Sequence, residues 1–225
     1  ARFFGFIFAT GAIVFVLGAI GAAGLIWHYQ QDLPDYTQLR NYEPPVMTRV
    51  HANDGSLIAE YARERRLYLP SSAIPPLVKQ AFISAEDKNF YTHHGYDVTG
   101  MAAAFRDAVL TRGQELRGAS TITQQVMKNF LLSGDRTGER KIKEIILATR
   151  LEETLTKDKI LELYLNEIFL GQNSYGVAAA AQTYFNKPLS DLAPHEAAFL
   201  ASLPKAPSNY HPVRQIDRLR DRRNF

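Results

Sequence analysis

A long uncharged run at the start of the chain limits what the rest can be. Residues Phe3–Trp27 carry no charged side chain and one hydroxyl, that of Thr10. A helix needs about 20 apolar residues to cross a bilayer. A cleaved signal peptide has a shorter apolar core and an Ala-x-Ala exit, whereas this run ends in Trp27, His28 and Tyr29, which suit the membrane interface. We therefore predict a single membrane-spanning anchor.

The charge before this run predicts the orientation of the anchor. Arg2 is the charge that precedes the apolar residues. The positive-inside tendency then places the N-terminus in the cytoplasm. We expect everything after residue 30 to lie on the outer face of the membrane.

Composition narrows the class of protein that follows the anchor. Hydrophobic residues make up 46% and charged residues 22% of the 225, which is typical of a folded chain. The net charge is only +3, and residues 134–166 hold seven basic and seven acidic side chains. This balance offers no one-sign patch for a nucleic acid. The absence of cysteine excludes disulfides and thiolate metal sites.

A short β-rich part precedes the helices. Residues 30–45 hold three prolines and many polar residues, which predicts a linker. Two β-favouring runs, Val46–Ala52 and Ser56–Ala62, flank Asn53-Asp54-Gly55, and such a turn predicts a hairpin. A third short strand is expected over Arg66–Leu69.

The remainder has helical periodicity, so the expected fold class is mostly α with a small β hairpin. Apolar residues recur at helical spacing after Pro76, which suits a first helical turn. Thr156 and Gly171 are a start and a stop signal for one later helix. The expected helices are Leu77–Ala85, Val98–Thr111, Ser120–Leu132 with Ser120 as cap, Thr137–Leu155, Lys157–Leu170, Tyr175–Phe185, Pro194–Leu203 and the charged run Arg214–Arg223.

The first chemically suggestive cluster lies at the end of the helix after Pro76. Glu86 and Asp87 end an otherwise apolar helix and precede aromatic residues, His93 and His94. A general base needs a carboxylate partly shielded from water, and Glu86 is the best candidate. An exposed acidic helix end is the alternative. A metal held by both histidines is disfavoured, because adjacent residues point in different directions and no HExxH spacing occurs.

The second cluster opens a helix at residues 118–129. Glycine followed by the hydroxyl of Ser120 predicts exposed N–H groups at the helix start, which favour an anion. Gln125 and Lys128 are three residues apart and share a face. A phosphate site and a plain capped helix both remain open.

The third cluster combines bases with one acid. Arg140 and Lys141 lie four and three residues before Glu144, and Arg136 precedes them. Such pairs are ordinarily surface ion pairs. The same groups also suit a diphosphate, with Glu144 ordering the cations or binding a divalent ion.

The fourth cluster, residues 157–166, has a buried apolar stripe. Its helix is expected to be structural, with Glu162 and Asn166 as supporting polar groups.

The order and spacing of these clusters resemble the peptidoglycan glycosyltransferases, glycosyltransferase family 51. The matching blocks are Glu-Asp-x-x-Phe-x-x-His-x-Gly at 86–95, Gly-x-Ser-Thr-Ile-Thr-Gln-Gln at 118–125, Arg-Lys-x-x-Glu at 140–144 and Ile-Leu-Glu-x-Tyr-Leu-Asn at 160–166. The likeness covers residues 46–212. The anchor and linker look like those of class A penicillin-binding proteins, in which a transpeptidase domain follows.

The resemblance implies a lysozyme-like glycosyltransferase domain and a reaction. It implies polymerisation of lipid II into β-1,4 glycan strands, with inversion and release of undecaprenyl diphosphate. Glu86 would be the catalytic base and Glu144 the second acid. The expected substrate contacts are Asp87, Ser120, Gln125, Lys128, Arg136, Arg140 and Lys141. Glu144 is also the candidate ligand of a divalent cation, Mg²⁺ or Mn²⁺, although none is required with certainty.

The resemblance also implies an arrangement along the chain and in the cell. We expect an anchor at 1–29, a linker at 30–45, the glycosyltransferase domain at 46–212 and the start of a linker to a transpeptidase domain at 213–225. The protein would be a single-pass inner-membrane protein with its catalytic domain on the periplasmic side. Its expected partners are lipid II, the growing glycan chain, membrane lipid and division or cell-wall synthesis proteins, but no nucleic acid. The alternatives are a lytic transglycosylase or muramidase and a membrane-tethered scaffold.

Overall fold

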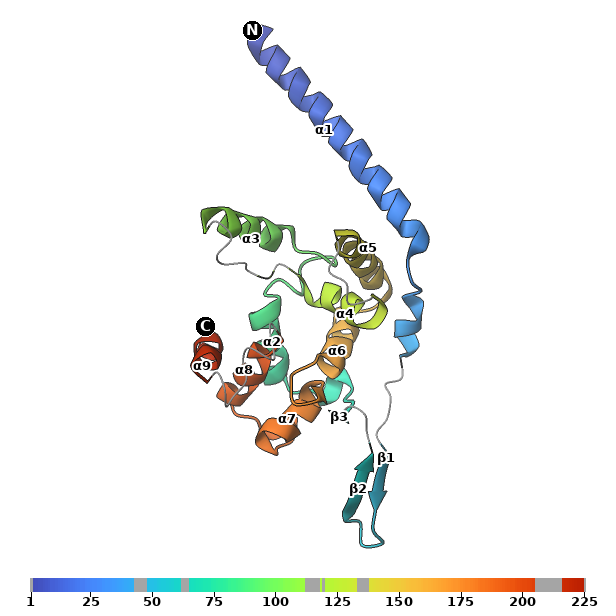
Figure 1. Ribbon diagram of the computed structural model, residues 1–225, viewed down its shortest axis with the longest axis vertical. Coiled ribbons are helices and arrows are strands. Elements are labelled where there is room, and N and C mark those ends of the chain that lie inside the picture. Colours follow the sequence, from blue (N-terminus) through green and yellow to red (C-terminus); the bar gives the residue numbers. More distant parts are fainter. Residues whose placement is uncertain are drawn as a thin grey trace.

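The first helix, α1 (Arg2–Tyr29), extends away from the rest of the chain in the computed structural model (Figure 1). The structure describes residues 2–42, 48–61, 65–111, 118, 120–132, 138–204 and 216–224. Within these residues, Phe8–Asp32 is long and apolar enough to cross a membrane, with a mean hydropathy of 2.2 and 0% of its apolar window buried. The predicted apolar helix is therefore confirmed, and the described residues leave its apolar window exposed.

The predicted linker is ordered where the structure describes it. Two 3-10 turns, η1 (Gln30–Asp32) and η2 (Thr37–Asn41), follow α1. Leu39 is buried in the core, and the Tyr42 hydroxyl donates a 2.6 Å hydrogen bond to Glu167. The segment thus packs against the body rather than acting as a free tether.

The predicted hairpin is confirmed. Strands β1 (Thr48–His51) and β2 (Leu57–Tyr61) pair antiparallel and project from the helices at the end remote from α1 (Figure 1). Gly55 takes a φ of +83° in the turn, and the Asp54 carboxylate accepts a 2.9 Å hydrogen bond from the Ser56 N–H. A positive φ is why glycine suits this turn.

The third predicted strand is shorter than expected. Strand β3 (Arg65–Arg66) pairs in parallel with β4 (Ser174–Tyr175), a strand that the sequence did not predict. The expected continuation to Leu69 is wrong, because Asn166 takes up the backbone there. Its side chain accepts from the Leu69 N–H at 2.8 Å and donates to the Leu69 carbonyl at 2.9 Å.

The helical prediction is confirmed in order and nearly in bounds. The helix predicted to Leu170 ends earlier because Ile168 is extended and the Leu170 N–H bonds the Ser174 carbonyl. The cap predicted at Ser120 lies instead at Thr121, which forms a capping box with Gln124. The helices are α2 (Pro76–Glu86), α3 (Val98–Leu110), α4 (Ile122–Leu131), α5 (Gly138–Thr154), α6 (Lys157–Glu167), α7 (Val177–Phe185), α8 (Pro194–Ser202) and α9 (Ile216–Asn224), with 3-10 turns η3 (Ser71–Ala73) and η4 (Leu189–Asp191).

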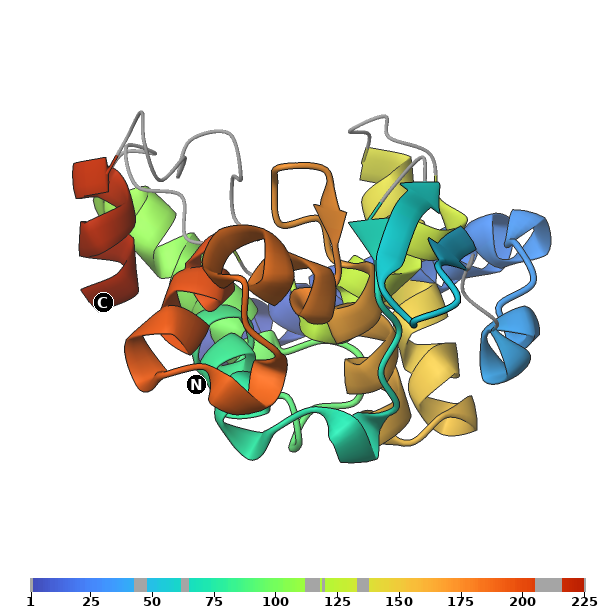
Figure 2. The ribbon, with the colours of Figure 1, turned by 90° about the horizontal axis from the view of Figure 1, so that it is seen from below.

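Helix α6 forms the centre of the body. Ile160, Leu161, Leu163, Tyr164 and Leu165 are all buried, so two faces of α6 are covered. Helix α4 packs on α5 and α6, while α2 packs on α8, with α9 outside α8 (Figure 2). The end of α2 and the start of α4 therefore face each other across a gap between two packed groups of helices.

Candidate active site

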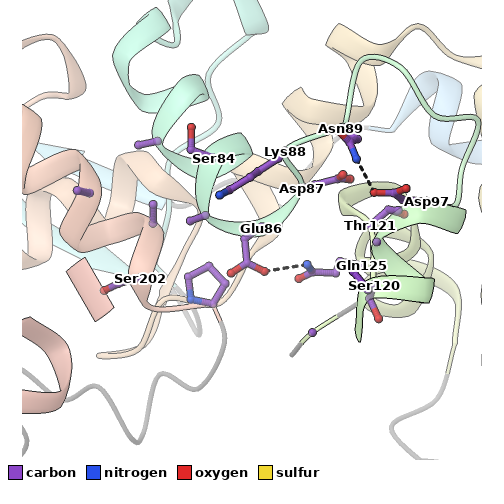
Figure 3. Close-up of a pocket in the computed structure, with 18 of the residues that line it drawn as sticks. Ser84, Glu86, Asp87, Lys88, Asn89, Asp97, Ser120, Thr121, Gln125 and Ser202 are labelled. Atoms are coloured by element: carbon purple, nitrogen blue, oxygen red, sulfur yellow. Dashed lines mark hydrogen bonds between the residues drawn. The ribbon is translucent and has the colours of Figure 1, made fainter. Parts of the chain in front are cut away.

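A cleft of about 740 Å³ lies between these two groups of helices (Figure 3). Its walls come from the end of α2, the start of α3, the start of α4, the end of α8 and α9. Of the predicted site residues, five line it: Glu86, Asp87, Ser120, Gln125 and Lys128.

Glu86 is the last residue of α2 and points into the cleft. Val78 and Phe82 anchor α2 in the core, and Glu86 lies one turn beyond Phe82 on the same face. The Gln125 amide donates a 3.0 Å hydrogen bond to Glu86 Oε2 across the cleft, with Ser202 on the far wall (Figure 3). A helix C-terminus disfavours a negative charge, so this carboxylate is well placed to accept a proton.

Asp87 is buried and connects the two walls. Its Oδ2 bonds His93 Nε2 at 2.9 Å and accepts from the Ile122 N–H at 2.8 Å. Ile122 begins α4, where exposed N–H groups favour a carboxylate. This geometry makes Asp87 a positioning group for the cleft, and its predicted contact with substrate stays a prediction.

A buried polar network that the sequence did not predict continues behind Asp87. His93 Nδ1 lies 3.7 Å from Glu152 Oε1, which also bonds Lys157 at 2.8 Å and Thr123 at 2.6 Å. Both ring nitrogens of His93 therefore face protein groups. The local signal was a histidine two residues after Tyr91. The partners of His93 on α5 and α6 are distant in the sequence, so local spacing does not predict them.

Gly95 is the last residue of the first sequence block, and its position requires glycine. It has a φ of +87°, and a Cβ placed there would lie 2.7 Å from the backbone of Ala148 and Thr149. Glycine is thus required by both conformation and close approach. Its carbonyl accepts a 2.7 Å hydrogen bond from the Thr121 hydroxyl, so the block is tied to α4 and α5 together.

The predicted ion pairs on α5 are present and reach toward the cleft. Glu144 is buried, with Oε1 3.0 Å from Arg140 Nε and Oε2 2.9 Å from Lys141 Nζ. Lys141 also donates to Ser120 Oγ at 2.9 Å and to Gln124 Oε1 at 3.1 Å. The cations of α5 are therefore connected to the cleft wall through Ser120.

The predicted cations lie in different places relative to the cleft. Lys128 is exposed on α4 and lines the cleft one turn from Gln125. Arg136 lies outside the described residues. Arg140, Lys141 and Glu144 do not line the cleft themselves.

The donor set around Glu144 does not fit the candidate Mg²⁺ or Mn²⁺ ion. Both carboxylate oxygens are occupied by cationic side chains. The described part of the chain contains no group of three or more His, Cys, Asp or Glu side chains that could hold a metal.

Several cleft residues were not predicted. Asp97 precedes α3, and hydrogen bonds from the Thr99 hydroxyl and the Gly100 N–H lower its pKa to about 2. Asn89 donates a 2.8 Å hydrogen bond to the same carboxylate (Figure 3). The other unpredicted polar lining residues are Ser84, Lys88, Thr99, Thr121, Ser202 and Arg223. Ser202 and Arg223 lie more than 110 positions after Glu86, so no local pattern links them to it.

The fourth sequence block has the structural role that was expected. Glu162 accepts from the Ser71 N–H at 2.7 Å and pairs with Lys159 at 2.5 Å. Burial raises the pKa of Glu162, but hydrogen bonds from Lys159, Tyr68 and the Ser71 N–H outweigh it and lower the pKa overall. Together with Asn166, this residue holds the segment that leads from the hairpin into α2.

Comparison with known proteins gave matches to a family model and to individual proteins. Residues 54–225 match the family described as Transglycosylase. Penicillin-binding protein 1A of Rickettsia prowazekii (strain Madrid E) is 49% identical over 216 residues, 95% of this chain and 27% of that protein. Its counterpart in Escherichia coli (strain K12) is 47% identical over 209 residues, 93% and 24% respectively.

A solved structure also resembles the chain. The crystal structure of penicillin-binding protein 1A from Haemophilus influenzae matches with 30% identity and a TM-score of 0.43, over 81% of this chain and 18% of that one. The chain thus spans about a quarter of the length of the curated relatives it matches, 27% in the first of them.

Proposed function

This chain belongs to the transglycosylase family, and we propose that it polymerises lipid II into β-1,4 glycan strands with release of undecaprenyl diphosphate. The observation that carries the proposal is the Glu86 carboxylate in the cleft, bonded by Gln125 from the opposite wall. A positioned carboxylate with a cationic wall suits transfer of a sugar from a diphosphate.

Glu86 is the base in this proposal. It takes the proton from the 4-hydroxyl of the acceptor sugar while that oxygen attacks the anomeric carbon of the donor. The bond from that carbon to the α-linked diphosphate breaks, and the new bond has the β configuration. Gln125 orients the carboxylate, and Asp87 keeps the ends of α2 and α4 together.

The cations act on the leaving group. Negative charge grows on the diphosphate oxygens, where fixed cations stabilise the transition state most. Lys128 lines the cleft, and Lys141 reaches it through Ser120. We assign Lys128, Arg136, Arg140 and Lys141 to the diphosphate, with Glu144 holding Arg140 and Lys141 in place.

The anchor and α3 fit a substrate that stays in the bilayer. Helix α1 spans the inner membrane in this proposal, with residues 46–212 as a periplasmic catalytic domain. Val98, Phe105, Val109 and Leu110 of α3 are more than 60% exposed. Helix α3 lies at the level of the C-terminal end of α1 (Figure 1), where an interface would place it beside lipid headgroups.

The length of the relatives supports a larger protein. Because the chain spans about a quarter of the penicillin-binding proteins it matches, 27% in the first of them, we assign residues 213–225 to a linker before a transpeptidase domain. The growing glycan chain and other cell-wall synthesis proteins are the expected partners of such a bifunctional enzyme.

A lytic transglycosylase or muramidase is the competing activity, because it would also use a single glutamate. It acts on finished glycan and has no diphosphate to hold, so the cations of α4 and α5 would lack a role. The test offers the purified 225-residue chain labelled lipid II in one reaction and purified cell wall in another. We expect labelled polymer from lipid II and no sugars released from cell wall; the opposite pattern would refute the proposal.

A further inference from the structure

The hydroxyl of Tyr164 is buried and, within the described part of the chain, has no hydrogen-bond partner. The residue is 1% exposed and lies on α6 in the centre of the body. Buried polar groups in folded proteins are nearly always bonded, and a phenylalanine would fill the same space without an unpaired donor. This hydroxyl therefore calls for an explanation beyond packing.

The ring of Tyr164 packs against α2 one helical turn before Glu86. It packs edge-on against Phe82, with centroids 6.2 Å apart and planes at 74°. Phe82 precedes Glu86 by one helical turn on the same face. Burial, and then the negative charges of Glu86 and Asp87, raise the pKa of Tyr164 well above its ordinary value. The hydroxyl thus keeps its proton and can donate a hydrogen bond to a carboxylate.

The two neighbouring carboxylates differ in what they face. Asp87 is buried and already bonds His93 and the Ile122 N–H. Glu86 lines the cleft, so its surroundings change when a sugar enters. Hydrogen bonds at catalytic groups are often long in a free enzyme and tighten in the substrate complex.

We propose that Tyr164 is a positioning residue whose hydroxyl donates to the Glu86 carboxylate from the core side when the acceptor sugar occupies the cleft. This inference rests on the proposed role of Glu86 as base. A donated hydrogen bond favours the ionised carboxylate. Tyr164 thereby keeps Glu86 able to accept a proton at lower pH than it otherwise would.

Other charged groups also line the cleft around Glu86. Among them, hydrogen bonds hold the pKa of Asp97 at about 2. His93 lies behind Asp87, with its Nε2 2.9 Å from Asp87 Oδ2. The described charged residues around Glu86 are Asp87 and Lys88 after α2, Asp97 before α3, Lys128 on α4 and Arg223 on α9.

The first test is the pH profile of kcat/KM for labelled lipid II with Tyr164→Phe in the 225-residue chain. We expect the acidic limb to move upward by about one pH unit, the effect of losing one hydrogen bond to a charged group. Tyr184→Phe is the control, because it also removes a partly buried hydroxyl, one that bonds the Leu170 carbonyl. An acidic limb that stays in place in Tyr164→Phe would overturn the inference.

The second test observes the Tyr164 ring by NMR and does not measure activity. Tyrosine labelled with ¹³C at Cζ gives a signal that is assigned to Tyr164 by its loss in Tyr164→Phe. With an unreactive analogue of the acceptor sugar bound in the cleft, we expect this NMR signal to shift with pH in the unchanged chain, to keep that shift in Asp87→Asn and to lose it in Glu86→Gln. A signal that does not titrate, or that follows Asp87 instead, overturns the inference while leaving the role of Glu86 intact. Full polymerisation by Glu86→Gln would overturn the proposed function instead.

Discussion

Asp87 shows how one buried carboxylate determines the shape of the cleft. A single oxygen joins the end of α2, the His93 ring and the first N–H of α4. Glu86 and Gln125 belong to these same two helices, so their 3.0 Å bond depends on this connection. Catalytic geometry is sensitive to shifts of about 1 Å, which makes Asp87 important even if it never touches substrate.

Asp87→Asn is therefore expected to lower both stability and activity. The amide keeps the shape but loses the charge, which costs about 2 kcal/mol of the free energy of unfolding. We expect polymerisation to fall about tenfold or more. Thermal unfolding and a lipid II assay measure the two effects. Asp221→Asn, exposed on α9, is the matched control, and equal behaviour of the two variants would contradict the positioning role.

Some contacts between single residues could not be predicted from the sequence. Glu86 and Gln125 were both candidates, but their contact spans 39 positions and depends on how two helices pack. Ser120 and Thr121 are adjacent hydroxyls that suit a cap equally well, and only the approach of Lys141 decides that Ser120 faces the cation. Patterns within one helix were predicted, and contacts between helices were not.

At the scale of elements, α3 is notable for the exposure of its apolar side chains. None of its residues is buried, and its exposed side chains include Phe105 and Leu110, each 73% exposed. An exposed apolar face of this kind usually marks a membrane or protein contact. It lies at the level of the C-terminal end of α1 (Figure 1), which favours lipid.

We expect α3 to lie in the membrane interface. The chain has no cysteine, so Phe105→Cys carries one fluorescent label that reports depth in reconstituted vesicles. Lipid-borne quenchers should reduce its fluorescence strongly, whereas a label at Asp54→Cys, at the hairpin turn far from α1, should be unaffected. Equal quenching at the two positions would exclude this placement of α3.

The elements themselves were largely predictable because each carries its own signals. Pro76 begins α2, Thr156 caps α6, and Asp54-Gly55 forms the hairpin turn. Strand β4 was not predictable, because it depends on pairing between Arg65–Arg66 and Ser174–Tyr175, more than 100 positions apart. The docking of the linker through Leu39 and Tyr42 is likewise a tertiary contact without a local pattern.

For the whole molecule, the anchor, the exposed α3 and the cationic wall of the cleft form one arrangement. In the proposed function, the anchor and α3 face the lipid tail of the substrate, the cations its diphosphate and Glu86 its acceptor sugar. The family membership of the chain agrees with this arrangement. The claim on which it all depends is that the Glu86 carboxylate accepts the proton of the acceptor hydroxyl.

Polymerisation of labelled lipid II by Glu86→Gln tests that claim most directly. The amide preserves the size of the side chain but cannot act as a base, and general-base catalysis contributes about 10²–10⁴-fold. Glu153→Gln, an exposed position on α5, is the matched control and should polymerise normally. We predict a loss of at least about 100-fold in Glu86→Gln with unchanged thermal unfolding. Full activity in a folded Glu86→Gln protein would contradict the account.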